Sequence, residues 1–151
     1  MIRKRFVIVL LAGFSLLSCN NTSTTDQEVE AVLHEDHHHD DGEAIALDNG
    51  QKWKVNDEMT PFVQTGKQLL DTYTETNDTD YKKLAEEMEG QNSQLIKSCT
   101  MDGKSHDELH KWLHPHLELV NKLSDAEDSD AAMKVVNELK ESYAMFSQYF
   151  E

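Results

Sequence analysis

Positive charge is scarce in this sequence, which has 14 lysines and arginines against 29 aspartates and glutamates. The formal net charge is −15 at pH 7. A surface this acidic repels nucleic acid and anionic lipid headgroups, and it attracts cations instead. The charge balance therefore excludes nucleic acid as an expected partner and favours a cationic one.

The sequence also lacks the short motifs that carry common chemistry. It has no glycine-rich nucleotide loop, no serine nucleophile elbow and no CxxCH haem-attachment motif. The CxxC pair of a zinc finger is absent as well. We therefore expect a protein that is not an enzyme.

No apolar run is long enough for a comfortable membrane span, which needs about 20 apolar residues. The longest run follows Arg3, Lys4 and Arg5 and extends from Phe6 to Leu17. A charged start followed by a short apolar run and a small-residue junction is the layout of a signal peptide. We therefore expect residues 1–18 to be removed.

The junction reads Leu16, Leu17, Ser18, Cys19. It resembles the lipobox of bacterial lipoproteins, and this resemblance implies that Cys19 is acylated and becomes the mature amino terminus. Several acyl chains, each contributing about 0.8 kcal/mol per buried methylene, would anchor the chain firmly to a membrane of the cell envelope. Asn20, in place of an aspartate, favours the outer membrane under the enterobacterial sorting rule. The alternative is an ordinary secreted protein with a chance cysteine at this position.

The remaining 133 residues carry a formal charge of −18, because the three basic residues of the leader are lost. This length fits one domain with a single core. Residues 19–43 are polar and lack an apolar period, which predicts a flexible tether. Residues 44–151 are expected to form a helical domain, and the mature part resembles small helical lipoproteins of the Bacteroidota.

Apolar residues recur three or four positions apart from residue 56 onward, which is the period of amphipathic helices. Four segments show this pattern, at about residues 57–76, 79–99, 105–123 and 125–150. Short connections make neighbouring helices antiparallel, so we predict an all-α, up-down-up-down four-helix bundle. Asp48, Asn49 and Gly50 form a turn signal, which predicts a short hairpin or extended segment before the bundle. We expect little other β-structure.

The third of these segments has two unusual features. Ser105 and Glu108 have the spacing of a capping box, which predicts the start of the helix. Pro115 removes a backbone hydrogen bond and should kink the helix, unless two consecutive helices meet near His114.

Every histidine of the helical part lies in one stretch, residues 98–116, which reads SCTMDGKSHDELHKWLHPH. On a helical projection His106 falls within the stripe of Leu109, Leu113 and Leu117, with His110 on its edge. The short turn after the second helix would bring two sulfur ligands towards them. The stretch therefore predicts a metal site made of Cys99, Met101, His106 and His110, with His114 and His116 as secondary ligands.

Sulfur and imidazole ligands suit Cu(I) or Zn(II), and the thioether favours copper. The ligand types are those of blue-copper sites, but the helical setting differs. The alternative is that Cys99 and Met101 fill the end of the core while His106 packs near the helix start and His110 is solvated. The aromatic residues are predicted to serve packing, at Trp53, Trp112 and Tyr143.

The tether has its own histidines, His34, His37, His38 and His39, interspersed with carboxylates. Such a tract binds Zn(II), Cu(II) or Ni(II) loosely and could hand the ion to the domain. The alternative is a solvated acidic linker with incidental histidines.

These observations predict an envelope lipoprotein that binds a transition metal, copper before zinc, for sequestration or transfer. One alternative is a non-catalytic structural or interaction module that docks on an envelope partner. Another is a haem-binding bundle, with His106 or His110 and either Met101 or Met59 as axial ligands.

Overall fold

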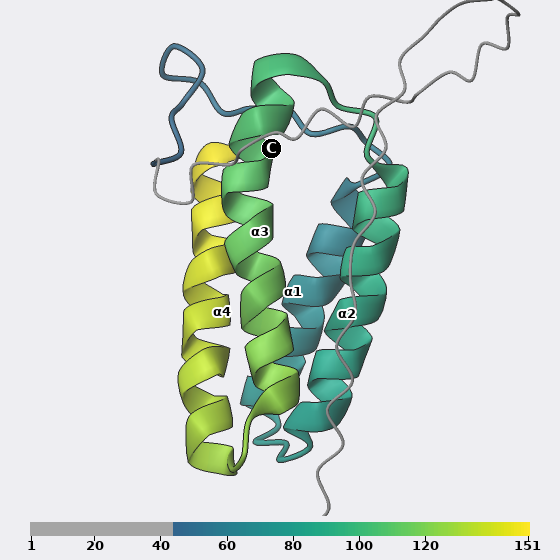
Figure 1. Cartoon of the computed structure of the whole chain (residues 1–151), viewed down its shortest axis with the longest axis vertical. Helices are drawn as coiled ribbons and strands as arrows, with labels where there is room; N and C mark the ends of the chain where they lie inside the picture. The colour runs from purple at the N-terminus through teal and green to yellow at the C-terminus, as the bar shows by residue number, and fades with distance from the viewer. Residues whose placement is uncertain (1–43) are drawn as a thin grey trace, which may run out of the picture. The chain divides into compact units, whose positions relative to one another are not determined.

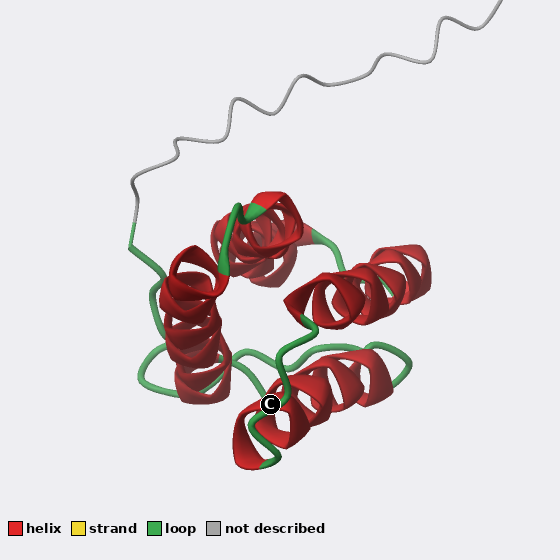
Figure 2. Cartoon of the chain, turned by 90° about the horizontal axis from the view of Figure 1, so that it is seen from below, coloured by secondary structure: helices red, strands yellow, loops and turns green. Residues whose placement is uncertain are grey.

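Residues 44–151 are the part of the chain that the structure, a computed structural model, describes. They form four helices (Figure 1): α1 spans Thr60–Glu75, α2 Tyr81–Ser98, α3 Gly103–Asp125 and α4 Ser129–Tyr149. Consecutive helices are antiparallel neighbours, and α4 packs back on α1 so that the four enclose one core (Figure 2). The predicted all-α, up-down-up-down bundle is confirmed.

Carboxylate caps begin two of the helices. Asp80 accepts a hydrogen bond from the backbone N–H of Lys83 at 3.0 Å, and Asp128 accepts one from that of Ala131 at 2.8 Å. Each carboxylate satisfies an amide that has no partner within the first turn of its helix. α1 instead has Pro61 in its first turn, where the missing N–H costs little.

The start of α3 differs from the prediction. The helix begins at Gly103, and the Ser105 hydroxyl donates to the Asp102 carbonyl at 3.1 Å. Glu108 does not reach back to cap the helix, because its carboxylate accepts the backbone N–H of Ala46 at 2.8 Å. The capping-box prediction is therefore wrong, and a partner distant in sequence is the reason.

Pro115 lies inside α3, which continues through it as one helix. The alternative of two helices meeting near His114 is therefore wrong. Packing of α3 against both α2 and α4 along its length stabilises the helix despite the backbone hydrogen bond that the proline removes.

A short segment before α1 begins with a tight turn. Asp48 and Gln51 exchange two backbone hydrogen bonds of 2.9 Å. Asn49 and Gly50 between them have φ of +51° and +87°. Positive φ at both central residues is typical of a type I′ turn, for which asparagine followed by glycine is the preferred pair. The predicted turn is confirmed.

The residues after this turn pair with the end of the chain rather than with the residues before it. The backbone N–H of Trp53 donates to Tyr149 at 2.8 Å, and its carbonyl accepts from Glu151 at 2.9 Å. The Trp53 indole donates to the Ala46 carbonyl at 2.6 Å. We call residues 44–56 the N-terminal strap, because they join α3 and the end of α4 across one end of the bundle.

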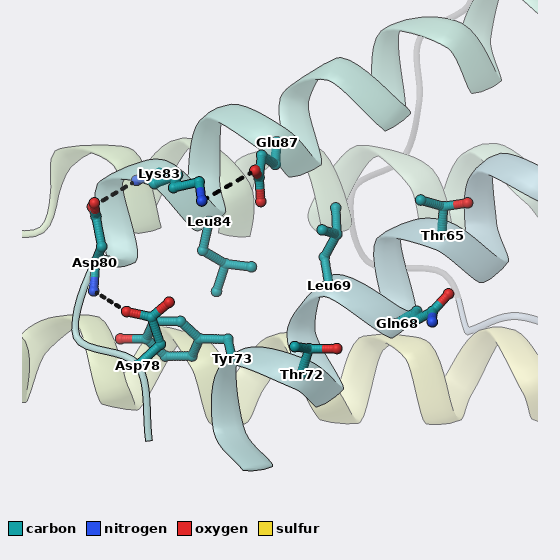
Figure 3. A pocket seen from close by; sticks show the side chains of 10 residues that line it. All are labelled: Thr65, Gln68, Leu69, Thr72, Tyr73, Asp78, Asp80, Lys83, Leu84 and Glu87. Atoms are coloured by element: carbon teal, nitrogen blue, oxygen red, sulfur yellow. Dashed lines mark hydrogen bonds and ion pairs between the residues drawn. The ribbon is translucent and has the colours of Figure 1, made fainter. Parts of the chain in front are cut away.

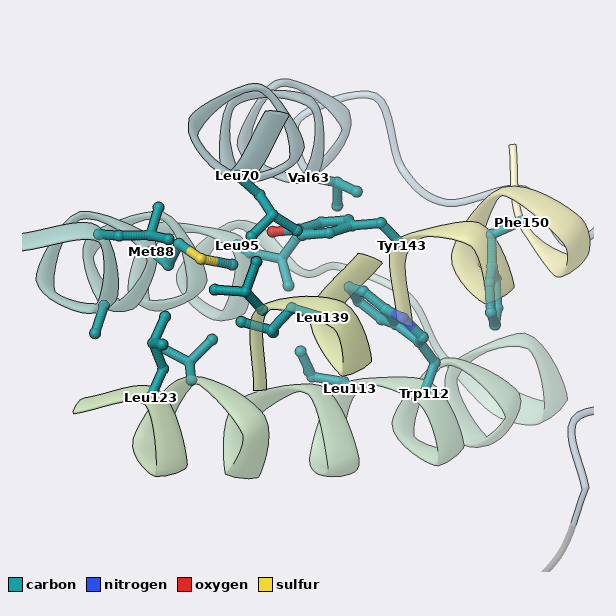
Figure 4. Packing of buried hydrophobic residues seen from close by; sticks show 14 of the residues in the cluster. Val63, Leu70, Met88, Leu95, Trp112, Leu113, Leu123, Leu139, Tyr143 and Phe150 are labelled. Atoms are coloured by element: carbon teal, nitrogen blue, oxygen red, sulfur yellow. The ribbon is translucent and has the colours of Figure 1, made fainter. Parts of the chain in front are cut away.

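The core is filled by apolar side chains from the strap and all four helices (Figure 4). Burying a large apolar side chain contributes about 1.5–3 kcal/mol, so this cluster is the main source of stability. Trp53, Trp112 and Tyr143 are 7%, 2% and 3% exposed, which confirms that they are packing residues. No helix within residues 44–151 is long and apolar enough to cross a membrane.

Candidate functional site

Three histidines form a line along one face of α3. His106, His110 and His114 follow one another at intervals of four residues, so each lies about one helical turn from the next. The ring centroids of His106 and His110 are 4.2 Å apart, and those of His110 and His114 are 4.9 Å apart. All three residues are half-buried. We call them the histidine row.

The spacing of the rings suits metal binding by neighbouring pairs. Two imidazoles that each place a nitrogen about 2.0–2.1 Å from a shared ion have ring centroids about 4.5–5 Å apart. Both neighbouring pairs are close to this range. The backbone rises about 12 Å from His106 to His114, and the three histidines do not form a group that could hold one ion together. Metal binding by the row would therefore use two neighbouring imidazoles at a time.

The charges beside the row favour a cation. Asp107 lies one turn before His110, where a carboxylate and an imidazole are surface neighbours on a helix. Lys111, which follows His110 in the chain, donates to Glu108 at 3.0 Å, and the side chain of Glu108 is only 5% exposed. Glu108 projects from the opposite side of α3, so this ion pair draws the ammonium group away from the row.

The sulfur ligands of the predicted site lie in the connection between α2 and α3. Cys99 follows the last residue of α2 and Met101 lies two residues further on, and both are half-buried against the core. Asn56 of the strap fixes this connection. Its amide group donates to the Ser98 carbonyl at 2.9 Å and accepts from the Thr100 N–H at 3.2 Å.

The predicted four-ligand site is found only in part. Within residues 44–151, no three histidine, cysteine, aspartate or glutamate side chains are grouped so that they could hold one metal ion. The structure therefore brings His106 and His110 together without adding Cys99 to them. Cys99 and Met101 contribute to the end of the core, as the alternative interpretation expected.

His116 does not extend the row, and its assignment as a secondary ligand is corrected. Its side chain is fully buried, with Nδ1 in a 2.9 Å hydrogen bond to the Ser142 hydroxyl. The Trp112 ring stacks on the imidazole at 4.8 Å and the Tyr143 ring meets it edge-on at 4.9 Å. His116 is therefore a core residue that links α3 to α4.

Burial sets the protonation of His116. Removal from water disfavours the imidazolium and lowers the pKa from 6.5 to about 4. Nε2 is buried and makes no hydrogen bond, as is also true of the Nδ2 of Asn92 on α2. At neutral pH the imidazole is therefore uncharged.

The burial of His116 could have been predicted from the core positions of α3. Buried positions follow one another at alternating spacings of four and three, at Leu109, Leu113, His116, Val120 and Leu123. The predicted stripe used a constant spacing of four, which rotates by about 40° at each step and leads to Leu117. Leu117 is only half-buried, and His106, placed in that stripe, is half-buried as well.

Two surface hollows lie away from the histidine row. One of about 270 Å³ lies between α1 and α2 (Figure 3). Its charged groups contact one another: Lys83 meets Glu87 at 3.7 Å, and Asp78 accepts the Asp80 N–H at 3.0 Å. The other, of about 260 Å³, lies between α1 and α4. Neither contains a histidine, so a metal ion on the row would bind at the surface of α3.

The remaining predicted positions lie outside the described residues. These are the lipidation site and the tether histidines, at Cys19, His34, His37, His38 and His39. Residues 34–38 read HEDHH, which has the HExxH spacing of some zinc enzymes. In that motif the two histidines share one face because the segment is a helix.

Comparison with known proteins gives no match to a family model, to a curated protein or to a solved structure.

Proposed function

We propose that this protein is an envelope lipoprotein that binds a transition-metal ion, copper above others, through the histidine row of α3. The supporting observation is the spacing of the rings, 4.2 Å and 4.9 Å between neighbouring centroids. Imidazole suits copper, zinc and nickel, and among the divalent first-row ions Cu(II) binds most tightly. The formal charge of −15 would raise the local concentration of cations.

The row supplies nitrogen ligands alone, which shifts the preferred oxidation state from Cu(I) towards Cu(II). Two protein ligands leave the other coordination positions of the ion open to water or to a ligand from another molecule. Such an ion exchanges readily, which suits transfer better than permanent storage.

The tether histidines would serve as a collecting segment in this proposal. His37, His38 and His39 precede residue 44, where the described domain begins, by five to seven residues. Their loose binding would hold ions near the domain, and the row would take them up. The lipid on Cys19 would keep both at the membrane.

Replacing both His106 and His110 with alanine should weaken Cu(II) binding by about 100-fold or more, because a chelating pair gains this much over single ligands. The measurement is a competition titration of the chain from residue 20 with Cys99 replaced by serine, so that Cu(II) does not oxidise the thiol. The four tether histidines are replaced by asparagine, so that the titration measures binding by the helical domain alone.

A matched control is available on α4. Lys134 and Glu138 have the same four-residue spacing and are both exposed, so replacing them with alanine also removes two long side chains from one face of a helix. This control should bind copper as the parent does. Equal affinity in the parent, the control and the histidine variant would contradict a site on the row.

Lipid attachment is tested separately through Cys19. Cys19→Ser should abolish the incorporation of labelled fatty acid into the full-length protein, expressed in its own host, since no thiol then remains at residue 19 to be acylated. Labelling followed by immunoprecipitation measures the loss. Equal labelling of the parent and of the variant would contradict a lipid on Cys19.

A further inference from the structure

We infer that His110 is the shared ligand of two overlapping metal sites on α3, so that one ion is bound by His110 together with either His106 or His114. The inference rests on the proposed function and adds the arrangement of the ligands to it. It assigns His114 a role equal to that of His106.

The geometry gives His110 two partners. Its ring centroid is 4.2 Å from that of His106 on one side and 4.9 Å from that of His114 on the other. Within residues 44–151 no three histidine, cysteine, aspartate or glutamate side chains are grouped so that they could hold one ion, so the three rings do not form a single site. The ion is therefore bound either by His106 and His110 or by His110 and His114.

The two sites exclude each other. Each needs a nitrogen of His110, and a neutral imidazole offers one unprotonated nitrogen at a time. The row should therefore hold one ion. Passing from one site to the other exchanges a single ligand while His110 stays bound to the ion.

The helix dipole makes the two sites unequal. His106 lies in the first turns of α3, which starts at Gly103. The N-terminal end of a helix carries partial positive charge and disfavours a cation there by about two- to fivefold in affinity. The 4.9 Å pair is also the closer to ideal spacing. The ion should therefore favour the pair of His110 and His114.

Three single variants test this inference: His106→Ala, His110→Ala and His114→Ala, each in the chain from residue 20 with Cys99→Ser and without tether histidines. Cu(II) affinity is measured by chelator competition. His110→Ala should lose about 100-fold, because neither pair survives. The two outer variants should each keep one site, so their association constants should add up to that of the parent, and His114→Ala should lose more than His106→Ala.

Electron paramagnetic resonance of the bound Cu(II) gives a second measurement. Two histidine nitrogens should couple to the copper in the parent and in both outer variants, and one in His110→Ala. Helical content from circular dichroism confirms that each variant is folded.

The possible failures are distinguishable. A parent that binds no copper, or three variants that bind as tightly as the parent, would overturn the proposed function. Loss in His106→Ala equal to that in His110→Ala, with His114→Ala unchanged, would show one fixed site and overturn the shared-ligand inference alone. An equally large loss in all three variants would also overturn it, because the ion would then need every ring.

Discussion

Acidification from pH 6.5 to about pH 4 should remove about 3 kcal/mol from the free energy of unfolding through His116 alone. Burial lowers the pKa of this imidazole from 6.5 to about 4. Above pH 6.5 it is neutral in both the folded and the unfolded chain and adds no pH dependence. Between pH 6.5 and 4 only the unfolded chain takes up the proton, so stability falls by about 1.36 kcal/mol per pH unit.

Chemical unfolding at pH 7 and at pH 4.5 measures this loss. Carboxylates titrate over the lower part of the same range, so the comparison uses His116→Leu, which fills a similar space and carries no proton. The difference in stability between the two pH values should be about 2–3 kcal/mol smaller in the variant. An identical pH dependence in the parent and in His116→Leu would contradict the assignment.

Gly66→Ala should lower the free energy of unfolding by about 1–3 kcal/mol, although alanine is the better helix former. A Cβ built on Gly66 overlaps the hydroxyl of Tyr143, and the ring carbon that bears the hydroxyl is 3.4 Å away. Tyr143 is 3% exposed, and its ring packs against His116 and Trp112. It therefore has little room to move, and α1 would have to shift away from α4.

The same conflict can be relieved by one further change. Tyr143→Phe removes the overlapping oxygen, so Gly66→Ala should be far less harmful in that background, and a double-mutant cycle measures the coupling. Gly90→Ala on α2 is the control, because nothing lies within 4 Å of its Cβ and alanine should stabilise the helix by up to about 1 kcal/mol. Equal losses for Gly66→Ala in the parent and in the Tyr143→Phe background would contradict the steric explanation.

The helices could be predicted from the sequence because their signal is local and repeated. Apolar residues recur over four or more turns in each helix, and Asp80 and Asp128 cap their helices by contacts within three residues. The predicted capping box at the start of α3 was wrong because the partner of Glu108 is distant in the sequence. Glu108 is bonded to Ala46, 62 residues away, and no local pattern shows such a partner.

In the candidate site, too, the local contacts could be predicted and the distant ones could not. The contact of His106 with His110 follows from a spacing of four in a helix, so the sequence was sufficient to predict it. The approach of Cys99 to those rings depended on the path of residues 99–102, which Asn56 fixes through hydrogen bonds across more than 40 positions. The burial of His116, by contrast, can be predicted from the sequence, because alternating spacings of four and three along α3 lead to this residue.

The pairing of the N-terminal strap with the end of α4 has a consequence for the order of folding. Trp53 and Phe150 form a parallel bridge between two points nearly the full length of the domain apart. Closing so long a loop costs more entropy than joining adjacent helices, and the cost is recovered only once the helices already hold the ends close. We expect the bridge to form last as the chain folds and to open first in the native state. In a chain fed across a membrane from its N-terminus, residues 53–55 must wait for the final residues to arrive before this end of the domain can close.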